Sequence, residues 1–178
     1  NKATGLDYAL RELGLSRHEV VGIGDAENDQ SFLRHCECAV AVANAAASTR
    51  DIVDIVTTAE NGSGVIELID ELIADDLQRT TGKLTRNLIA LGQRPDGSTV
   101  QLPPYGHNLL VAGPSGCGKS TLTAGLIERL IDKDYQVCVV DPEGDYGTLR
   151  DVVALGNQQR APSVSEVLAI LEDPKINL

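Results

Sequence analysis

The segment from Gly113 to Thr121, GPSGCGKST, constrains the chain more than any other stretch. It fits the pattern G-x-x-x-x-G-K-S/T of a phosphate-binding loop without a mismatch. The apolar run 107–112 precedes it and predicts a buried strand, and apolar residues recur at helical spacing after it. Backbone N–H groups of such a loop converge on phosphates, and the dipole of the following helix favours negative charge. The segment therefore predicts a nucleotide site rather than a chance glycine-rich turn.

Each residue type in this loop has an expected part in binding. Lys119 should reach the β- and γ-phosphates and act as a catalytic residue, and the Ser120 hydroxyl should ligate Mg²⁺. Glycines let the backbone approach the ligand because they carry no Cβ. The predicted nucleotide-binding residues are Gly113, Pro114, Ser115, Gly116, Cys117, Gly118, Lys119, Ser120 and Thr121.

The composition limits the remaining options. Of 178 residues, 42% are hydrophobic, but only four Tyr and one Phe are aromatic, so the core must be aliphatic. The net charge is −11. Residues 1–75 carry 5 basic and 14 acidic side chains, and residues 76–178 carry 10 basic and 12 acidic ones. Neither half therefore offers a basic surface for nucleic acid. No apolar run approaches the roughly 20 residues that span a bilayer. Methionine is absent, including at position 1, and we expect an internal fragment of a longer protein.

Four cysteines at these spacings predict reduced thiols rather than disulfides or a zinc site, which favours a cytoplasmic location. His35 beside Cys36-Glu37-Cys38 is the weaker metal alternative.

Hydrophobic periodicity predicts an α/β fold with strands and helices in alternation. Strands are expected at 20–24, 39–43 and within 52–56, and helices at 3–14, 31–35, 45–51 and from Val65 to Ile73. A hairpin is expected from 88–91 and 98–102, with Pro95-Asp96-Gly97 as its turn. Further strands are expected at 107–112, 136–140 and 152–155, and Ser163 with Glu166 forms a capping box for a last helix through Glu172.

The loop GDAEND at residues 24–29 follows a predicted buried strand and gathers carboxylates with an amide. Such hard oxygen ligands suit Mg²⁺, which takes one or two carboxylates and keeps several waters. A solvated acidic turn is the alternative from the loop alone.

Residues 1 to about 75 resemble the C-terminal part of a haloacid-dehalogenase (HAD) type phosphatase of the Cof-like subgroup. The resemblance rests on GDAEND after a strand, on Lys2 ahead of the preceding helix, on AVAVANA at 39–45 and on the glycine turn before the last helix. It implies that Lys2 steadies an aspartyl-phosphate, that Asp25 and Asp29 ligate magnesium with support from Asn28, and that Asn44 lies near the phosphate. It also implies a phosphorylated small molecule as substrate.

The family's nucleophile lies in a D-x-D motif, and none precedes Lys2. Without the carboxylate that becomes phosphorylated, covalent phosphoryl transfer cannot run. We therefore predict that residues 1–178 alone give no phosphatase turnover.

Residues 85–178 resemble HerA/FtsK-type ATPase domains. The resemblance rests on the stretch from Leu91 to Pro103, on GHNLLVAG at 106–113 and on VVDPEGDY at 139–146. It implies ATP hydrolysis, usually by a homo-oligomeric ring that moves DNA or protein. The acidic Walker B strand of that family is not identifiable. Asp141 and Glu143 either substitute for it in part or form a capping cluster with Asp145 around a turn.

We thus expect the C-terminal part of a Rossmann-like HAD domain (1–76), a linker with a short β hairpin (77–106), and the N-terminal part of a P-loop NTPase domain (107–178). The leading hypothesis is a fusion of a magnesium-dependent phosphatase with an ATPase. A nucleotide-sensing module without turnover and a small-molecule kinase are the alternatives.

Overall fold

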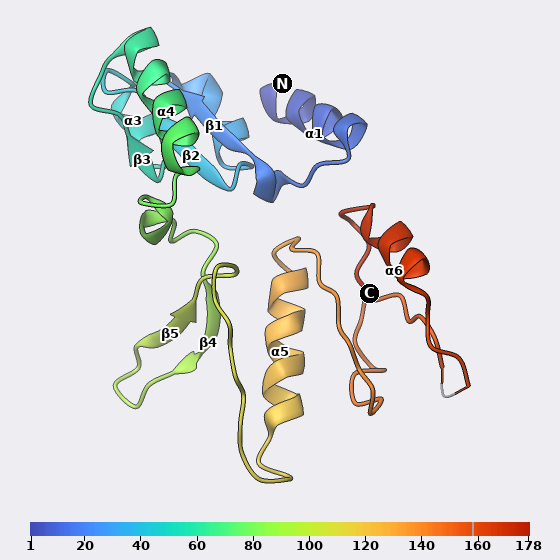
Figure 1. Cartoon of the computed structure of the whole chain (residues 1–178). Helices are drawn as coiled ribbons and strands as arrows, with labels where there is room; N and C mark the ends of the chain where they lie inside the picture. Colours follow the sequence, from blue (N-terminus) through green and yellow to red (C-terminus); the bar gives the residue numbers. More distant parts are fainter. Residues whose placement is uncertain (158) are drawn as a thin grey trace. The chain divides into compact units, whose positions relative to one another are not determined.

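The computed structural model describes residues 1–157 and 159–178, which form two compact units, Asn1–Arg86 and Asn87–Leu178 (Figure 1). Of the residues predicted as a linker, 77–86 belong to the first unit and 87–106 to the second. Each unit is described below by itself.

The first unit is built on a parallel sheet of three strands in the order β1 (Val21–Gly24), β2 (Cys38–Ala41) and β3 (Ile55–Val56). In register, Val21 lies opposite Cys38 and Val40 opposite Ile55. The central strand β2 is buried along its whole length, because it has a neighbour on each edge and helices over its faces. The predicted α/β class with a parallel sheet is confirmed.

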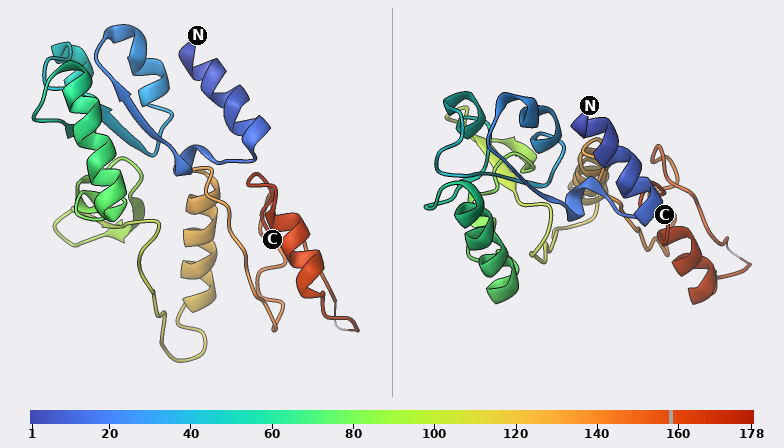
Figure 2. Two further views of the ribbon diagram at one scale, coloured as in Figure 1. Left: turned by 45° about the horizontal axis from the view of Figure 1, so that its top comes forward. Right: turned by 90° about the horizontal axis from the view of Figure 1, so that it is seen from above.

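Four helices accompany this sheet: α1 (Lys2–Leu13), α2 (Gln30–Leu33), α3 (Ala47–Arg50) and α4 (Asn61–Asp75). Three short 3₁₀ turns lie at Arg17–Glu19, Glu27–Asp29 and Thr81–Lys83. Helix α4 places Leu68 against Cys38 and Val40 of β2, and α1 lies beside α2 (Figure 2). Gly14 ends α1 in the left-handed conformation, with φ 66°, which a glycine adopts without a steric penalty.

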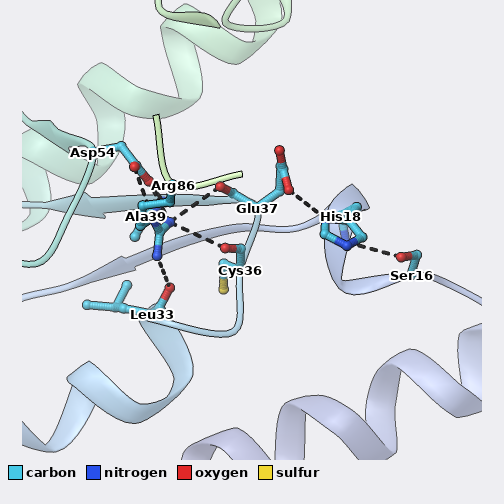
Figure 3. A network of polar contacts seen from close by, with 8 residues as sticks. All are labelled: Ser16, His18, Leu33, Cys36, Glu37, Ala39, Asp54 and Arg86. Carbon is cyan, nitrogen blue, oxygen red and sulfur yellow. Dashed lines mark hydrogen bonds and ion pairs between the residues drawn. The ribbon is translucent and has the colours of Figure 1, made fainter. Parts of the chain in front are cut away.

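The segment after α4 is anchored to the first unit by Leu77 and Arg86. Leu77 is buried in the same core cluster as Val40 and Leu68. The Arg86 guanidinium forms a two-point ion pair with the buried Asp54 carboxylate, with Nε–Oδ1 at 3.0 Å and Nη2–Oδ2 at 2.5 Å (Figure 3). It also donates to the carbonyl oxygens of Leu33, Cys36 and Glu37, each at 3.3 Å. Arg86 thus ties this segment to the loop between α2 and β2.

The second unit begins with the antiparallel hairpin of β4 (Ile89–Gln93) and β5 (Thr99–Leu102). Asp96 accepts a 2.8 Å hydrogen bond from the Ser98 N–H, and Gly97 has φ 84°, so the predicted turn and hairpin are confirmed. Helices α5 (Lys119–Ile131) and α6 (Val164–Leu171) follow. The predicted capping box of α6 is present, because Ser163 and Glu166 bond to each other's backbone N–H groups.

The buried strands predicted at 107–112 and 136–140 are wrong. Neither segment is a strand in the described part of the chain, and Leu110 and Val140 are each 88% exposed. The strand expected at 152–155 reduces to one bridge between Val152 and Asn177. Near Cys138, hydrogen bonds join Val139 N–H to Leu178 O at 2.7 Å and Leu178 N–H to Val137 O at 3.0 Å. An apolar run predicts burial but not a partner, and a strand needs a continuous partner.

Candidate functional sites

The first candidate site is the acidic loop that follows β1. The Asp29 side chain is buried, and its Oδ1 pairs with the Lys2 ammonium at the start of α1. Its Oδ2 accepts hydrogen bonds from the N–H groups of Asp25 at 3.1 Å and Ala26 at 3.3 Å. Gly24 allows the Asp29 side chain to approach the end of β1 this closely, because a Cβ at position 24 would lie 2.7 Å from the Asp29 Cβ. The loop therefore brings Lys2 and the backbone of Asp25 together around the Asp29 carboxylate.

The charge state of Asp29 follows from these contacts. Burial alone would raise the pKa of its carboxyl, but hydrogen bonds from Lys2, Asp25 and Ala26 together outweigh burial and lower the pKa below its ordinary value. Asp29 is therefore ionised at neutral pH and keeps Lys2 paired. Asp25 and Asn28 are exposed, so their oxygens face solvent while both Asp29 oxygens are already engaged.

The acidic loop is braced by residues that the sequence analysis did not single out. Ala46 N–H donates to the Asp25 carbonyl at 2.8 Å. The Ser48 hydroxyl donates to Glu27 at 3.3 Å and accepts from the Gln30 amide at 3.1 Å. The Ser48 contacts join positions about 20 residues apart, so no local sequence pattern predicts them. They fix the loop from the side of α3.

Asn44, which the resemblance places near the phosphate, lies in the turn after β2 and contacts Asn61, the first residue of α4. Its amide donates to the Asn61 side chain at 2.9 Å, and its carbonyl accepts from the Asn61 N–H at 3.0 Å. Asn61 has a positive φ of 51°, which an asparagine tolerates better than most residues. The pair closes the turn that leads into the helix, a role that the sequence analysis missed.

The second candidate site is the glycine loop ahead of α5. Gly116 and Gly118 have φ values of 77° and 93°, in the left-handed region where glycine is favoured, and the helix starts directly at Lys119. Residues 113–118 are all exposed. A Cβ on Gly113 would lie 2.6 Å from the Cys117 sulfur, so the loop curls back closely on itself. The N-terminal turn of α5, in which Lys119 and Ser120 are half-buried, therefore lies at the end of a tight, exposed glycine loop.

The side chains of Lys119 and Ser120, the first two residues of α5, already have partners. Lys119 Nζ donates to the Pro114 carbonyl at 3.0 Å, and the Ser120 hydroxyl donates to Asp145 Oδ2 at 2.9 Å. A cavity of about 820 Å³ opens beside this turn, lined among others by Ser120, Thr121 and Asp145. Ser120 therefore lies at the cavity, whereas the Lys119 ammonium is held at the Pro114 carbonyl of the glycine loop.

Comparison with known proteins divides the chain in the same order. Residues 1–69 match the family of haloacid dehalogenase-like hydrolases, and residues 105–178 match the central domain of helicase HerA. The chain joins a HAD-like segment to a HerA-like segment. The acidic loop lies in the HAD-like segment, and the glycine loop lies in the HerA-like segment.

The HAD-like segment is similar to several proteins named phosphoglycolate phosphatase. It is 41% identical over 69 residues to a phosphoglycolate phosphatase of Methanothermobacter thermautotrophicus, covering 39% of this chain and 31% of that protein. It is 38% identical over 76 residues to one of Staphylothermus marinus, covering 40% of this chain and 32% of that protein. The chain thus spans about a third of the length of these curated relatives. A haloacid dehalogenase-like hydrolase structure from Bacteroides thetaiotaomicron aligns at 33% identity with a TM-score of 0.39, over 40% of this chain and 27% of that one.

In the HerA-like segment, the acidic stretch at 141–145 has two distinct parts. Asp141 accepts hydrogen bonds from the N–H groups of Gly144 at 2.9 Å, Asp145 at 3.1 Å and Tyr146 at 2.9 Å. The bond from Tyr146 is the largest influence on the pKa of Asp141, which is lowered despite an opposing effect of burial. This arrangement favours the capping-turn alternative for Asp141, whereas Asp145 reaches Ser120.

The described residues contain no group of three or more His, Cys, Asp or Glu side chains that could hold a metal ion. Within the described part of the chain, no helix is long and apolar enough to cross a membrane.

Proposed function

We propose that the HerA-like segment binds ATP with Mg²⁺ through residues 113–121, as part of a domain that hydrolyses ATP. The observation that carries this proposal is the exposed glycine loop that runs directly into α5 with Lys119 and Ser120 as its first two residues. Such a helix N-terminus offers unpaired N–H groups and a favourable dipole to phosphates. The match to the HerA central domain supports the same assignment.

Lys119 would act by charge. Its ammonium is held at the Pro114 carbonyl and would exchange that neutral acceptor for phosphate oxygens, which bind it more strongly because they are charged. In phosphoryl transfer the protein contributes mainly positioning and electrostatic stabilisation, so a fixed cation beside the γ-phosphoryl group is the expected catalytic contribution. Mg²⁺ would neutralise charge on the phosphates, with Ser120 as its protein ligand.

The test is the affinity for Mg-ATP by isothermal titration calorimetry. Lys119→Ala should abolish measurable binding, whereas Lys175→Ala, which removes an exposed lysine from the same unit, should bind like the parent chain. Equal affinities of the parent and Lys119→Ala would reject the loop assignment.

For the HAD-like segment we propose part of a magnesium-dependent phosphatase site for a phosphorylated small molecule. Asp25 and Asn28 present their oxygens to solvent and would ligate Mg²⁺, which would supply charge neutralisation to the phosphoryl group. Asp29, fixed by backbone N–H groups, would hold Lys2 toward the phosphate, so its contribution to the metal would be weaker than that of Asp25. The names of these relatives make phosphoglycolate a first substrate to try.

Residues 1–178 carry no D-x-D motif ahead of Lys2, so we propose that this stretch gives no phosphatase turnover by itself. Hydrolysis of p-nitrophenyl phosphate in Mg²⁺ should stay at the buffer rate. A metal-dependent rate that Asp25→Ala removes would overturn this.

One observation favours nucleotide sensing without turnover as a second candidate. Asp141 is committed to its own turn, so it is a poor substitute for the catalytic acid of a Walker B strand. Retained ATP binding with no release of phosphate by a longer protein would favour sensing, and transfer of label from ATP to a metabolite would favour a kinase.

From the HerA likeness we also propose assembly into a homo-oligomeric ring and DNA or protein as the cargo. The free cysteines support a cytoplasmic location.

A further inference from the structure

Ser120 and Asp145 are joined across 25 residues of sequence. The Ser120 hydroxyl donates a 2.9 Å hydrogen bond to Asp145 Oδ2, and both residues line the cavity of about 820 Å³ beside α5. Thr121 and Thr148 line the same cavity and add hydroxyl oxygens to its wall, which also contains apolar side chains and Arg129. Oxygen donors are the ligands that Mg²⁺ prefers.

The loop that carries Asp145 is held by the neighbouring Asp141. The Asp141 carboxylate accepts three hydrogen bonds from backbone N–H groups, and one of them comes from Asp145 itself, at 3.1 Å. Gly144 permits this tight turn with φ 80°. Because Asp141 fixes the backbone at Asp145, the carboxylate of Asp145 is presented toward the first turn of α5 by a structured loop.

A serine that ligates a cation uses an oxygen lone pair, so its proton must point to another acceptor. A carboxylate is a strong acceptor for that proton, and it makes the serine oxygen a better ligand. We infer that Asp145 is a positioning residue of the Mg²⁺–nucleotide site, which accepts the Ser120 proton and turns the Ser120 lone pairs toward the metal. This inference rests on the proposed nucleotide binding at residues 113–121.

The test compares ADP affinity with Mg²⁺ and with EDTA, measured by calorimetry on the whole chain. In the parent, Mg²⁺ should tighten ADP binding. In Asp145→Asn this gain should fall about tenfold, the size expected when a hydrogen-bond partner of a metal ligand is lost. The affinity in EDTA should stay unchanged, because Asp145 acts only through the metal. Asp132→Asn, which removes an exposed carboxylate at the end of α5, should keep the full gain.

A double-mutant cycle separates positioning from general charge. Ser120→Ala should lose the Mg²⁺ gain, and adding Asp145→Asn to it should cost nothing further, because Asp145 acts through Ser120. The affinity of each variant for Mn²⁺ in the presence of ADP, followed by electron paramagnetic resonance, should give the same order. Melting curves that match the parent would exclude misfolding as the cause.

The outcomes distinguish this inference from the proposed function. If the parent chain binds no ADP under either condition, the assignment of the glycine loop fails and takes the role of Asp145 with it. If the parent shows the Mg²⁺ gain and Asp145→Asn keeps it, only the role of Asp145 is overturned. Additive losses in the cycle would also overturn it, since Asp145 would then act independently of Ser120.

Discussion

The two units follow the same alternation of apolar runs and helices, but their side chains are packed differently. In the first unit the central strand β2 is fully buried, with Val40 and Ala41 at 0% exposure. In the second unit Leu110 and Val140 are each 88% exposed, although their runs are equally apolar. The first unit contains three strands that pair with one another, whereas the described second unit has only a hairpin and isolated bridges. The apolar run of β2 is thus buried between two paired strands, whereas the runs around Leu110 and Val140 have no continuous partner strand in the described residues.

The cysteines provide the sharpest measure of this difference and the largest expected effect. Burial raises the pKa of Cys36 to about 11 and that of Cys38 to about 12, whereas Cys117 and Cys138 are exposed. At pH 8 the buried thiols should be thiolate in fewer than about one molecule in a thousand, and the thiolate is the reactive form.

A colorimetric disulfide reagent at pH 8 should therefore modify Cys117 and Cys138 at once and the other two only after denaturation. Mass spectrometry of the labelled peptides identifies the sites. If all four thiols reacted at the same rate in the native chain, Cys36 and Cys38 would be no better protected from solvent than Cys117 and Cys138.

Arg86→Ala tests what holds the first unit together. Removing the guanidinium leaves Asp54 buried and charged without its main partner, so we expect a loss of about 3 kcal/mol in the free energy of unfolding. The measurement is urea unfolding followed by far-UV circular dichroism.

Arg79→Ala is the matched control. Arg79 pairs with Asp75 at 2.9 Å on the surface, with its side chain 87% exposed, and should cost about 0.5 kcal/mol or less. Similar losses in the two variants would show that the Arg86 contacts add no more than a surface ion pair.

Two glycine substitutions compare steric closure in the two units. A Cβ at Gly64 would lie 2.5 Å from the Ala59 carbonyl oxygen, so Gly64→Ala should cost about 2 kcal/mol or more through displaced backbone. Gly118→Ala meets open space, and its φ of 93° should cost about 1 kcal/mol by strain alone. Urea denaturation measures both losses. If Gly118→Ala lowered the free energy of unfolding more than Gly64→Ala, the closer packing around Gly64 would be contradicted.

The smallest expected effect is a pH dependence in the first unit. The pKa of Asp29 is lowered by folding, so its contribution to stability is present above the unfolded pKa and is lost as pH falls through the folded pKa. Lys2→Gln removes one cause of the lowered value. Because Lys2 is 54% exposed, solvent screening should limit the loss at pH 7 to about 0.5 kcal/mol.

At a pH below the folded pKa of Asp29, the Lys2→Gln variant and the parent should unfold with the same free energy. A constant difference between them at all pH values would show that Lys2 contributes by packing and not through Asp29.

Features that depend on a few consecutive residues could be predicted from the sequence. The hairpin turn at Asp96 and the capping box of Ser163 with Glu166 are of this kind, because their hydrogen bonds join residues two or three apart. Lys2 and Asp29 were assigned to one site by resemblance, since 27 residues separate them. The roles of Arg86 and Asp145 were missed, because their partners lie 32 and 25 residues away and no local pattern marks them. The strand at 107–112 was wrong for the same reason, since periodicity contains no information about the neighbour.

The Arg86 anchor has a mechanical consequence. Only residues 87 and 88 separate it from the start of β4, so tension applied to the chain from the HerA-like side reaches Arg86 before it reaches α4 or the sheet. The ion pair to Asp54 and the bonds to the carbonyls of Leu33, Cys36 and Glu37 would share that load in parallel. The Arg86 contacts would then resist the applied force, so that the acidic loop of the first unit keeps its conformation while the chain is pulled.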